Sequence, residues 1–170
     1  MKASERREQI LTMLEGKTEY LNATKMAEAL GVSRQIIVSD IALLRAQGHR
    51  IISTPRGYLL EESHSSGMTE VVVCKHGKAE ILEEFFCVVD NGCTVLDVSV
   101  DHPIYGLLSA TLNIRSRYDA QMFVEHVGQS EASPLSALTQ GIHSHRIRFE
   151  DRASFQRVQT ALRELGVLVE

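Results

Sequence analysis

Two histidines separated by one residue, His143 and His145, stand in the segment TQGIHSHRIRFED, residues 139–151. In a β-strand, side chains two positions apart point to the same face, so both imidazoles would lie on one side of a sheet. Such a pair can bind one divalent transition metal, but two ligands are too few to complete a metal site. The pair therefore directs attention to other side chains that can supply ligands.

Two further ligands are His76, at the end of a strand predicted over 70–75, and Glu84, in a helix predicted over 78–90. A strand end and the helix that follows it can fold back to share one site. Together with the histidine pair they would supply three nitrogens and one oxygen. Such a set suits Zn²⁺, Ni²⁺, Fe²⁺ or Co²⁺ better than Ca²⁺ or Mg²⁺, which prefer oxygen ligands.

The spacing leaves alternatives open for this site. Glu80 and Glu83 compete with Glu84 for the role of the carboxylate ligand, and Cys74 also lies close by in the sequence. A same-face histidine pair is in addition common on solvated surfaces, where it binds nothing. The residues alone therefore indicate a metal site without fixing its ligands.

A second unusual segment is DHPIYGLL, residues 101–108, in which Pro103 and Gly106 predict a turn between two strands. His102 and Tyr105 lie on this turn. One interpretation is a plain hairpin connection with a hydrogen-bonded histidine. The other is the edge of a pocket, where an imidazole and a phenol hold a small polar ligand.

The region that carries these residues alternates between strand and helix patterns and follows a polar linker predicted at 61–68, EESHSSGM. We therefore expect two domains, residues 1–62 and 69–170, and an α+β fold class. The remaining elements predicted for the second domain are strands at 94–100, 107–114, about 141–149 and 166–169, and helices at 117–128 and 152–164.

The first domain has the pattern of a winged helix-turn-helix, with three helices followed by two short strands around a Pro-Arg-Gly turn. A small residue, Ala27, is followed by Gly31 and then by Ile37. Two helices that cross steeply need a small residue at the contact, a glycine in the tight turn and a branched residue to fix the crossing. This arrangement leaves the outer face of the third helix free to enter a DNA major groove.

Several side chains of this domain are candidates for DNA contacts. Ser33 is a natural N-cap for the third helix, and Arg34, Gln35 and Ser39 lie on its free face, where arginine and glutamine suit base edges. Residues 1–60 hold nine lysines and arginines against six acidic residues, although the whole chain has a net charge of −4. The candidates for phosphate contacts are Arg45, Arg50 and Arg56, the last at the tip of the wing.

Composition places the protein in a reducing compartment. The cysteines Cys74, Cys87 and Cys93 form a sparse, odd set without a CxxC motif, which fits the cytoplasm better than a disulfide framework. No apolar run approaches the roughly 20 residues that span a bilayer, so we expect no membrane partner.

The chain resembles a known family at several motifs. MAEALGVSRQIIVSDIALLRAQGHRI is similar to a biotin-repressor-type helix-turn-helix, and CKHGKAEILEEF, DHPIYG and GIHSHRI follow it in the order found in the three-histidine (3H) domain of niacin-responsive repressors, the NiaR or YrxA family. The resemblance implies a repressor of genes for NAD synthesis and niacin uptake, with nicotinic acid as co-repressor. It also implies a regulatory domain with one transition metal, held by residues that match His76, Glu84, His143 and His145.

If the effector is nicotinic acid, the predicted contacts are His102, Tyr105 and Arg115. Further candidates to bind its carboxylate are Arg117 and Lys78. A single helix-turn-helix reads only a short half-site, so we expect a homodimer on a two-fold operator. Two alternatives are a repressor that senses the metal itself and a metal-dependent enzyme. The sequence has no Gly-rich phosphate loop, nucleophile elbow or HExxH motif to support the enzyme, and the second domain is too short for a biotin ligase.

Overall fold

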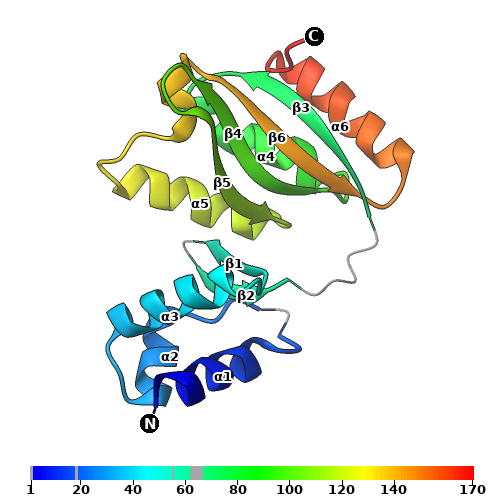
Figure 1. The fold of residues 1–170 in the computed structure, drawn as a ribbon. Coiled ribbons are helices and arrows are strands. Elements are labelled where there is room, and N and C mark those ends of the chain that lie inside the picture. Colours follow the sequence, from blue (N-terminus) through cyan, green and yellow to red (C-terminus); the bar gives the residue numbers. More distant parts are fainter. Residues whose placement is uncertain (1, 18, 55, 62–66) are drawn as a thin grey trace. The chain divides into compact units, whose positions relative to one another are not determined.

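The computed structural model describes residues 2–17, 19–54, 56–61 and 67–170. The chain forms two compact units, Met1–Ser65 and Ser66–Glu170 (Figure 1). Each unit has its own buried hydrophobic core. Residues 62–66 of the expected linker and Pro55 of the expected wing turn lie outside the described residues. Among the helices of the described residues, none combines the length and the apolar character that crossing a membrane requires.

The N-terminal unit has three helices and a two-stranded antiparallel hairpin. The helices are α1 (Ala3–Leu14), α2 (Ala23–Leu30) and α3 (Arg34–Ala46), and the strands are β1 (Ile51–Thr54) and β2 (Gly57–Leu60). These elements occur in the order of a winged helix-turn-helix, as expected from the sequence. Its core is formed by the buried side chains Ile10, Leu14, Ala23, Met26, Ala27, Ile37, Ile41, Leu44 and Ile51.

The turn between α2 and α3 has the features that the sequence predicts. Gly31 ends α2 in the left-handed conformation with φ of 64°, which a residue with a Cβ adopts only with strain. Ala27 and Ile37 are both buried in the core. Asp40, buried in α3, accepts from Arg6 of α1 at 2.6 Å, so an ion pair ties these two helices together.

The C-terminal unit is built on a four-stranded antiparallel sheet with the order β3-β6-β4-β5. The helices α4, α5 and α6 pack against the sheet through the core (Figure 1). The strands are β3 (Met68–Lys75), β4 (Thr94–His102), β5 (Gly106–Ile114) and β6 (Ile142–Phe149), and the helices are α4 (Ile81–Val89), α5 (Arg117–Gln129) and α6 (Arg152–Leu165). Two 3₁₀ helices, η1 (Lys78–Glu80) and η2 (Leu135–Thr139), complete the unit. The α+β class expected from the sequence is confirmed.

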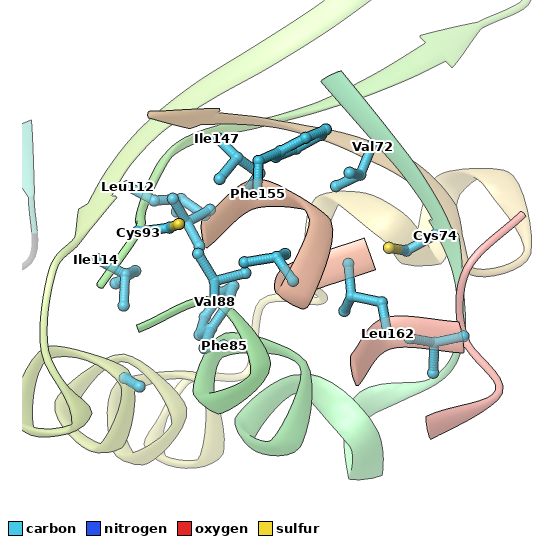
Figure 2. Close-up of a cluster of buried hydrophobic side chains, with 14 of the residues drawn as sticks. Val72, Cys74, Phe85, Val88, Cys93, Leu112, Ile114, Ile147, Phe155 and Leu162 are labelled. Carbon is cyan, nitrogen blue, oxygen red and sulfur yellow. The ribbon is translucent and has the colours of Figure 1, made fainter. Parts of the chain in front are cut away.

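The core of this unit lies between the sheet and its helices. Figure 2 shows side chains such as Val72 from β3, Phe85 from α4, Ile147 from β6 and Leu162 from α6 gathered in one cluster. Along β6, burial alternates strictly, so His143 and His145 share the buried face with Ile147 and Phe149. Two imidazoles therefore project into an otherwise apolar layer, which they enter only if their polar atoms find partners there.

The elements differ from the sequence expectations at three places. The helix expected over 78–90 begins as η1, and η2 was not expected at all. The terminal strand expected over 166–169 is reduced to a single bridge between Leu168 and Cys74. Its shortness follows from Gly166, which ends α6 with φ of 79° and leaves few residues to pair.

Candidate metal centre and DNA-binding face

The structure brings His76, Glu84, His143 and His145 together in the C-terminal unit. Antiparallel pairing of β3 with β6 places Cys74 opposite His143, so the end of β3 delivers His76 beside the start of β6. Glu84 comes from α4, which covers this part of the sheet. All four side chains are at most 3% exposed.

The carboxylate of Glu84 lies at the centre of the three imidazoles. Its Oε2 is 2.8 Å from Nε2 of His76 and 3.3 Å from Nε2 of His145, and its Oε1 is 3.2 Å from Nε2 of His143. The donor atoms of His76, Glu84 and His143 all lie within 4.8 Å of one another. Three nitrogens and one carboxylate thus converge from three elements of the fold.

Backbone carbonyls orient all three rings. Nδ1 of His76 contacts the carbonyl oxygen of Gly77 at 2.8 Å, Nδ1 of His143 contacts that of Gly141 at 2.8 Å, and Nδ1 of His145 contacts that of Asp97 at 2.6 Å. A carbonyl oxygen only accepts, so each Nδ1 carries a proton, and whenever a ring is neutral the lone pair of its Nε2 faces Glu84. This second layer of contacts is the usual means by which metal-binding histidines are held.

The cluster of Glu84 and three imidazoles needs additional positive charge. Lone pairs on Nε2 that face a carboxylate repel it unless a proton or a cation lies between them. Nε2 of His76 and of His145 are buried and make no satisfactory hydrogen bond within the described residues, although Oε2 of Glu84 lies 2.8 and 3.3 Å away. Orphaned donor atoms of this kind fit a bound transition metal, for which nitrogen and carboxylate oxygen are suitable ligands.

The pKa values of Glu84, His76 and His145 also indicate that the cluster favours positive charge. Burial alone would raise the pKa of Glu84, but the positive charge of His145 and the close polar contacts with all three imidazoles outweigh it and hold the pKa well below its ordinary range. Burial alone would lower the pKa of His76 and of His145, but the neighbouring Glu84 outweighs it and both pKa values are raised. The cluster therefore favours positive charge around a negative carboxylate.

Glu84 is the carboxylate that the fold selects among the three that the spacing left open. Glu83 is exposed on α4, and Glu80 accepts from the backbone N–H of Gly77 at 3.1 Å at the start of η1. Cys74 is fully buried, and burial, together with the negative charge of Glu84, raises the pKa of its thiol well above the ordinary value. Without a metal, Cys74 is therefore a neutral thiol.

Gly141 links two of the histidines. Its carbonyl accepts from the Nδ1 of His143 at 2.8 Å and from the backbone N–H of His76 at 3.2 Å. Its φ is +89°, and a Cβ at this position would lie 2.5 Å from the carbonyl oxygen of His76. Only glycine allows both contacts, so this residue helps to position the histidine cluster.

Gly141→Ala is therefore expected to weaken metal binding by about 10- to 100-fold, the usual effect of disturbing the residues that orient metal ligands. The measurement is a competition titration against a chromophoric chelator. Gly92→Ala is the matched control, because Gly92 also has a positive φ of 73° but a Cβ there meets nothing within 4 Å. Equal metal affinities for the two variants would contradict the role of Gly141.

A cavity of about 150 Å³ lies beside the cluster. Its polar lining comes mainly from the histidines and Glu84, and the described residues that line it include no lysine or arginine. Part of the wall comes from Pro134, Leu135 and Ser136 around the start of η2, which the sequence did not indicate. The other lining residues are Ile81, Phe85, Val98, Ala110, Leu112 and Phe123.

The predicted effector residues lie apart from this cavity. Nδ1 of His102 accepts from the backbone N–H groups of Ile104 and Tyr105 at 3.2 and 3.3 Å, and its ring stacks on Tyr105 with centroids 5.0 Å apart. His102 is therefore hydrogen-bonded within the turn, as the interpretation of a plain hairpin connection expects. Neither His102, Tyr105 nor Arg115 is among the described residues that line the cavity. Their role in effector binding stays a prediction.

The other two candidates for the effector carboxylate also lie outside the lining. Arg117 donates to Asp90 at 2.7 and 2.5 Å, and its guanidinium covers the ring of Phe86. Lys78 begins η1 and is not among the lining residues. The cavity thus offers a different set of residues from the one that the sequence suggested.

In the N-terminal unit, the residues predicted to read DNA lie on the exposed side of α3. Arg34, Gln35 and Ser39 are exposed, and Ser39 donates its hydroxyl to the carbonyl of Gln35 at 3.1 Å. Ser33 caps the helix by accepting from the backbone N–H of Ile36 at 3.4 Å. This face of α3 is thus polar and accessible.

The predicted phosphate contacts have partners within the protein. Arg45 donates from Nε to the carbonyl of Ile51 at 2.8 Å, and Arg50 lies 3.7 Å from Glu61. Arg56 lies at the hairpin tip with its guanidinium 5.2 Å from the ring centroid of Tyr20. The contact of Arg45 joins α3 to β1, whereas the contact of Arg50 joins the two ends of the hairpin. The roles of these residues at DNA stay predictions.

A winged helix-turn-helix joined to an α+β unit with a buried histidine cluster defines a transcription regulator. A family model described as the 3H domain matches residues 69–170, and one described as an HTH domain matches residues 6–59. A protein named "Probable transcription repressor NiaR", from Thermotoga maritima, is 39% identical over 166 residues, which cover 98% of this chain and 94% of that protein. "Transcription repressor NadR" from Bacillus subtilis is 34% identical over 168 residues, covering 97% and 93%.

The chain belongs to this family of transcription repressors, which join a helix-turn-helix domain to a 3H domain. It is a regulator rather than an enzyme, so the enzyme alternative is set aside.

Proposed function

We propose that the chain is a homodimeric repressor of genes for NAD synthesis and niacin uptake, with nicotinic acid as co-repressor and one divalent transition metal per chain. Residues 1–62 would bind operator DNA in the cytoplasm, and residues 69–170 would bind the metal and the effector. The names of the relatives, NiaR and NadR, agree with the niacin resemblance of the motifs. The observation that carries the proposal is the cavity that opens against the histidine cluster.

The metal would be held by His76, Glu84, His143 and His145, whose donor set suits Ni²⁺, Zn²⁺, Fe²⁺ or Co²⁺. When bound, it supplies positive charge at the polar end of the cavity. The backbone carbonyls of Gly77, Gly141 and Asp97 hold the rings by their Nδ1–H groups.

The residues that line the cavity suit nicotinic acid. A flat aromatic ring fits walls formed by side chains such as Phe85, Leu112 and Phe123, and its carboxylate or ring nitrogen needs a positively charged partner. No lysine or arginine is among the described lining residues, so the histidine cluster is the source of that charge. An uncharged amide would gain less from it, which favours the acid over nicotinamide.

Regulation requires that the effector bind one conformation of the repressor better than another, because equal binding to both shifts nothing. A dimer supplies two recognition helices for a two-fold operator, and a change in their spacing alters affinity for it. The effector would therefore act by favouring the dimer geometry that fits the operator.

Ala110→Phe tests the proposal by filling the cavity, since Ala110 lines it from β5. We expect the variant to bind metal normally but to lose more than tenfold in affinity for nicotinic acid, because the added ring occupies the space of the ligand. The measurement is operator binding by the metal-loaded protein, titrated with nicotinic acid, nicotinamide and biotin. Thr111→Phe is the control, because neighbouring residues of a strand point to opposite faces and Thr111 is exposed.

Two results would contradict the proposal. If metal alone switches operator binding and nicotinic acid adds nothing, the chain is a metal-sensing repressor. If Ala110→Phe responds to nicotinic acid as the unaltered protein does, the effector binds elsewhere.

A further inference from the structure

A second cavity, of about 130 Å³, lies within the N-terminal unit between the start of α2, the start of α3 and the hairpin β1–β2. Arg34 and Arg56 line it together with the hydroxyl-bearing residues Thr24, Ser53 and Thr54. The described residues that line it include no aspartate or glutamate. Two guanidinium groups and several hydroxyls around one small space form a site for an anion.

The walls of this cavity are held in fixed positions. Leu21, directly before the N-cap of α2, exchanges two backbone hydrogen bonds with Tyr58 of β2, at 2.8 and 2.9 Å. At Gly57, a Cβ would lie 2.5 Å from the carbonyl oxygen of Leu21, so the hairpin packs against this segment at the closest possible range. Arg56 is thereby positioned beside the beginning of α2.

Arg34 is the residue whose role this geometry changes. It is the first residue of α3 and lines the cavity, whereas Gln35 and Ser39 of the same helix do not. In the described part of the chain, Arg34 makes no ion pair that would neutralise its charge. From the sequence it was predicted to read a base edge, but its position favours an anion held between α3 and the hairpin.

We propose that this cavity binds one backbone phosphate of the operator, with Arg34 and Arg56 as its two cationic contacts. Base reading by α3 then falls to Gln35 and Ser39. Phosphate contacts fix the register and orientation of a protein on DNA but carry no sequence information. Arg34 therefore anchors α3 and the hairpin on the same strand while its neighbours read the groove. The inference rests on operator binding as stated under the proposed function.

Salt dependence and sequence discrimination separate a phosphate contact from a base contact. The affinities of Arg34→Ala and Gln35→Ala are measured for a duplex from the chain's own promoter region and for a scrambled duplex, between 50 and 200 mM salt. Arg34→Ala is expected to weaken both complexes by the same factor and to lower the slope of log affinity against log salt by about 1. Gln35→Ala is expected to weaken only the promoter complex, roughly tenfold, with the slope unchanged.

Two further variants serve as controls. Lys17→Ala removes one exposed positive charge that does not line the cavity, and it should leave the salt slope near that of the unaltered protein. Arg34→Lys keeps the charge but loses the bidentate geometry, so it should retain the slope with reduced affinity. Arg34 is exposed and its replacement should not affect folding, which circular dichroism checks.

The inference is overturned if Arg34→Ala weakens only the promoter complex and leaves the salt slope intact, since Arg34 would then read a base. An unaltered protein that does not prefer the promoter duplex would instead refute the proposed function. Even then, the salt slope on the scrambled duplex decides whether Arg34 contacts phosphate.

Discussion

Replacing Glu84 with glutamine should lower the affinity of the chain for divalent transition metals by more than about 100-fold, because it removes a proposed ligand rather than a supporting residue. The glutamine has almost the same shape, so the packing of α4 against the sheet is retained. The carboxylate contacts all three Nε2 atoms at 2.8 to 3.3 Å and is the negative charge of the proposed site. The amide lacks this charge and turns its own N–H donors toward some of the lone pairs.

The measurement is metal content after dialysis, together with the midpoint of thermal unfolding with metal and with chelator. In the unaltered protein, metal should raise the midpoint, because a ligand that binds only the folded state stabilises it. In Glu84→Gln the two midpoints should coincide. Glu83→Gln is the matched control, since Glu83 precedes Glu84 on the same helix and is exposed.

The same pair of variants connects the metal centre to gene regulation. If the effector depends on the charge of the histidine cluster, Glu84→Gln should also lose the response of operator binding to nicotinic acid, whereas Glu83→Gln keeps it. Full metal occupancy in Glu84→Gln would show that the ligands lie elsewhere. Normal nicotinic acid response without metal would separate the effector site from the cluster.

The helix-turn-helix could be predicted well from the sequence because its constraints are local. Ala27, Gly31 and Ile37 lie within eleven consecutive residues, and each is required by the close crossing of two neighbouring helices. The cap residues Asn22 and Ser33 act on the N–H groups of residues two or three positions later. No contact distant in sequence is needed to recognise such a unit.

The histidine pair was predictable from the two-residue period of a strand. The spacing of possible ligands, however, could not decide which glutamate completes the site. Helical periodicity distinguishes the glutamates. Ile81, Glu84, Phe85 and Val88 are the buried residues of α4 and follow the i, i+3, i+4, i+7 pattern of an apolar face. A carboxylate within such a face must be paired, which distinguishes Glu84 from Glu83.

The cavity could not be predicted because its walls come from segments far apart in the sequence. Ala110 and Leu112 from β5, Phe123 from α5 and Leu135 from η2 become neighbours only when the sheet and helices pack. The segment before β6 also has no helical or strand periodicity that would indicate a wall. The sequence instead directed attention to His102 and Tyr105, whose types suit a ligand but which are not among the described residues that line this cavity.

Metal binding should strengthen as pH rises from 5 to 8, because protons compete with the metal for the same Nε2 atoms. In the metal-free protein the pKa values of His76 and His145 are raised, so their rings stay protonated to a higher pH than free histidine. Each proton that the metal displaces lowers its apparent affinity about tenfold for every pH unit below that pKa. With two such rings, the change across the range should exceed about 100-fold.

The stability of the metal-free protein should instead fall as the pH rises above about 6.5. The raised pKa values of His76 and His145 contribute stability that is complete below about 6.5, the ordinary pKa of histidine, and is lost as pH rises through the folded pKa values. The depressed pKa of Glu84 contributes stability above about 4.5, which is lost as pH falls through its lowered value. The cluster therefore stabilises the metal-free fold most between about pH 4.5 and 6.5.

Thermal unfolding with metal and with chelator at pH 5, 6, 7 and 8 checks both expectations at once. The difference between the two midpoints should be smallest at pH 5 and should grow until the histidines of the metal-free protein are neutral. Glu84→Gln removes the carboxylate that raises the pKa values of His76 and His145, so its metal-free midpoint should lose this pH dependence. A difference between midpoints that stays constant from pH 5 to 8 would mean that the metal displaces no protons from these rings, and the histidines would then not be its ligands.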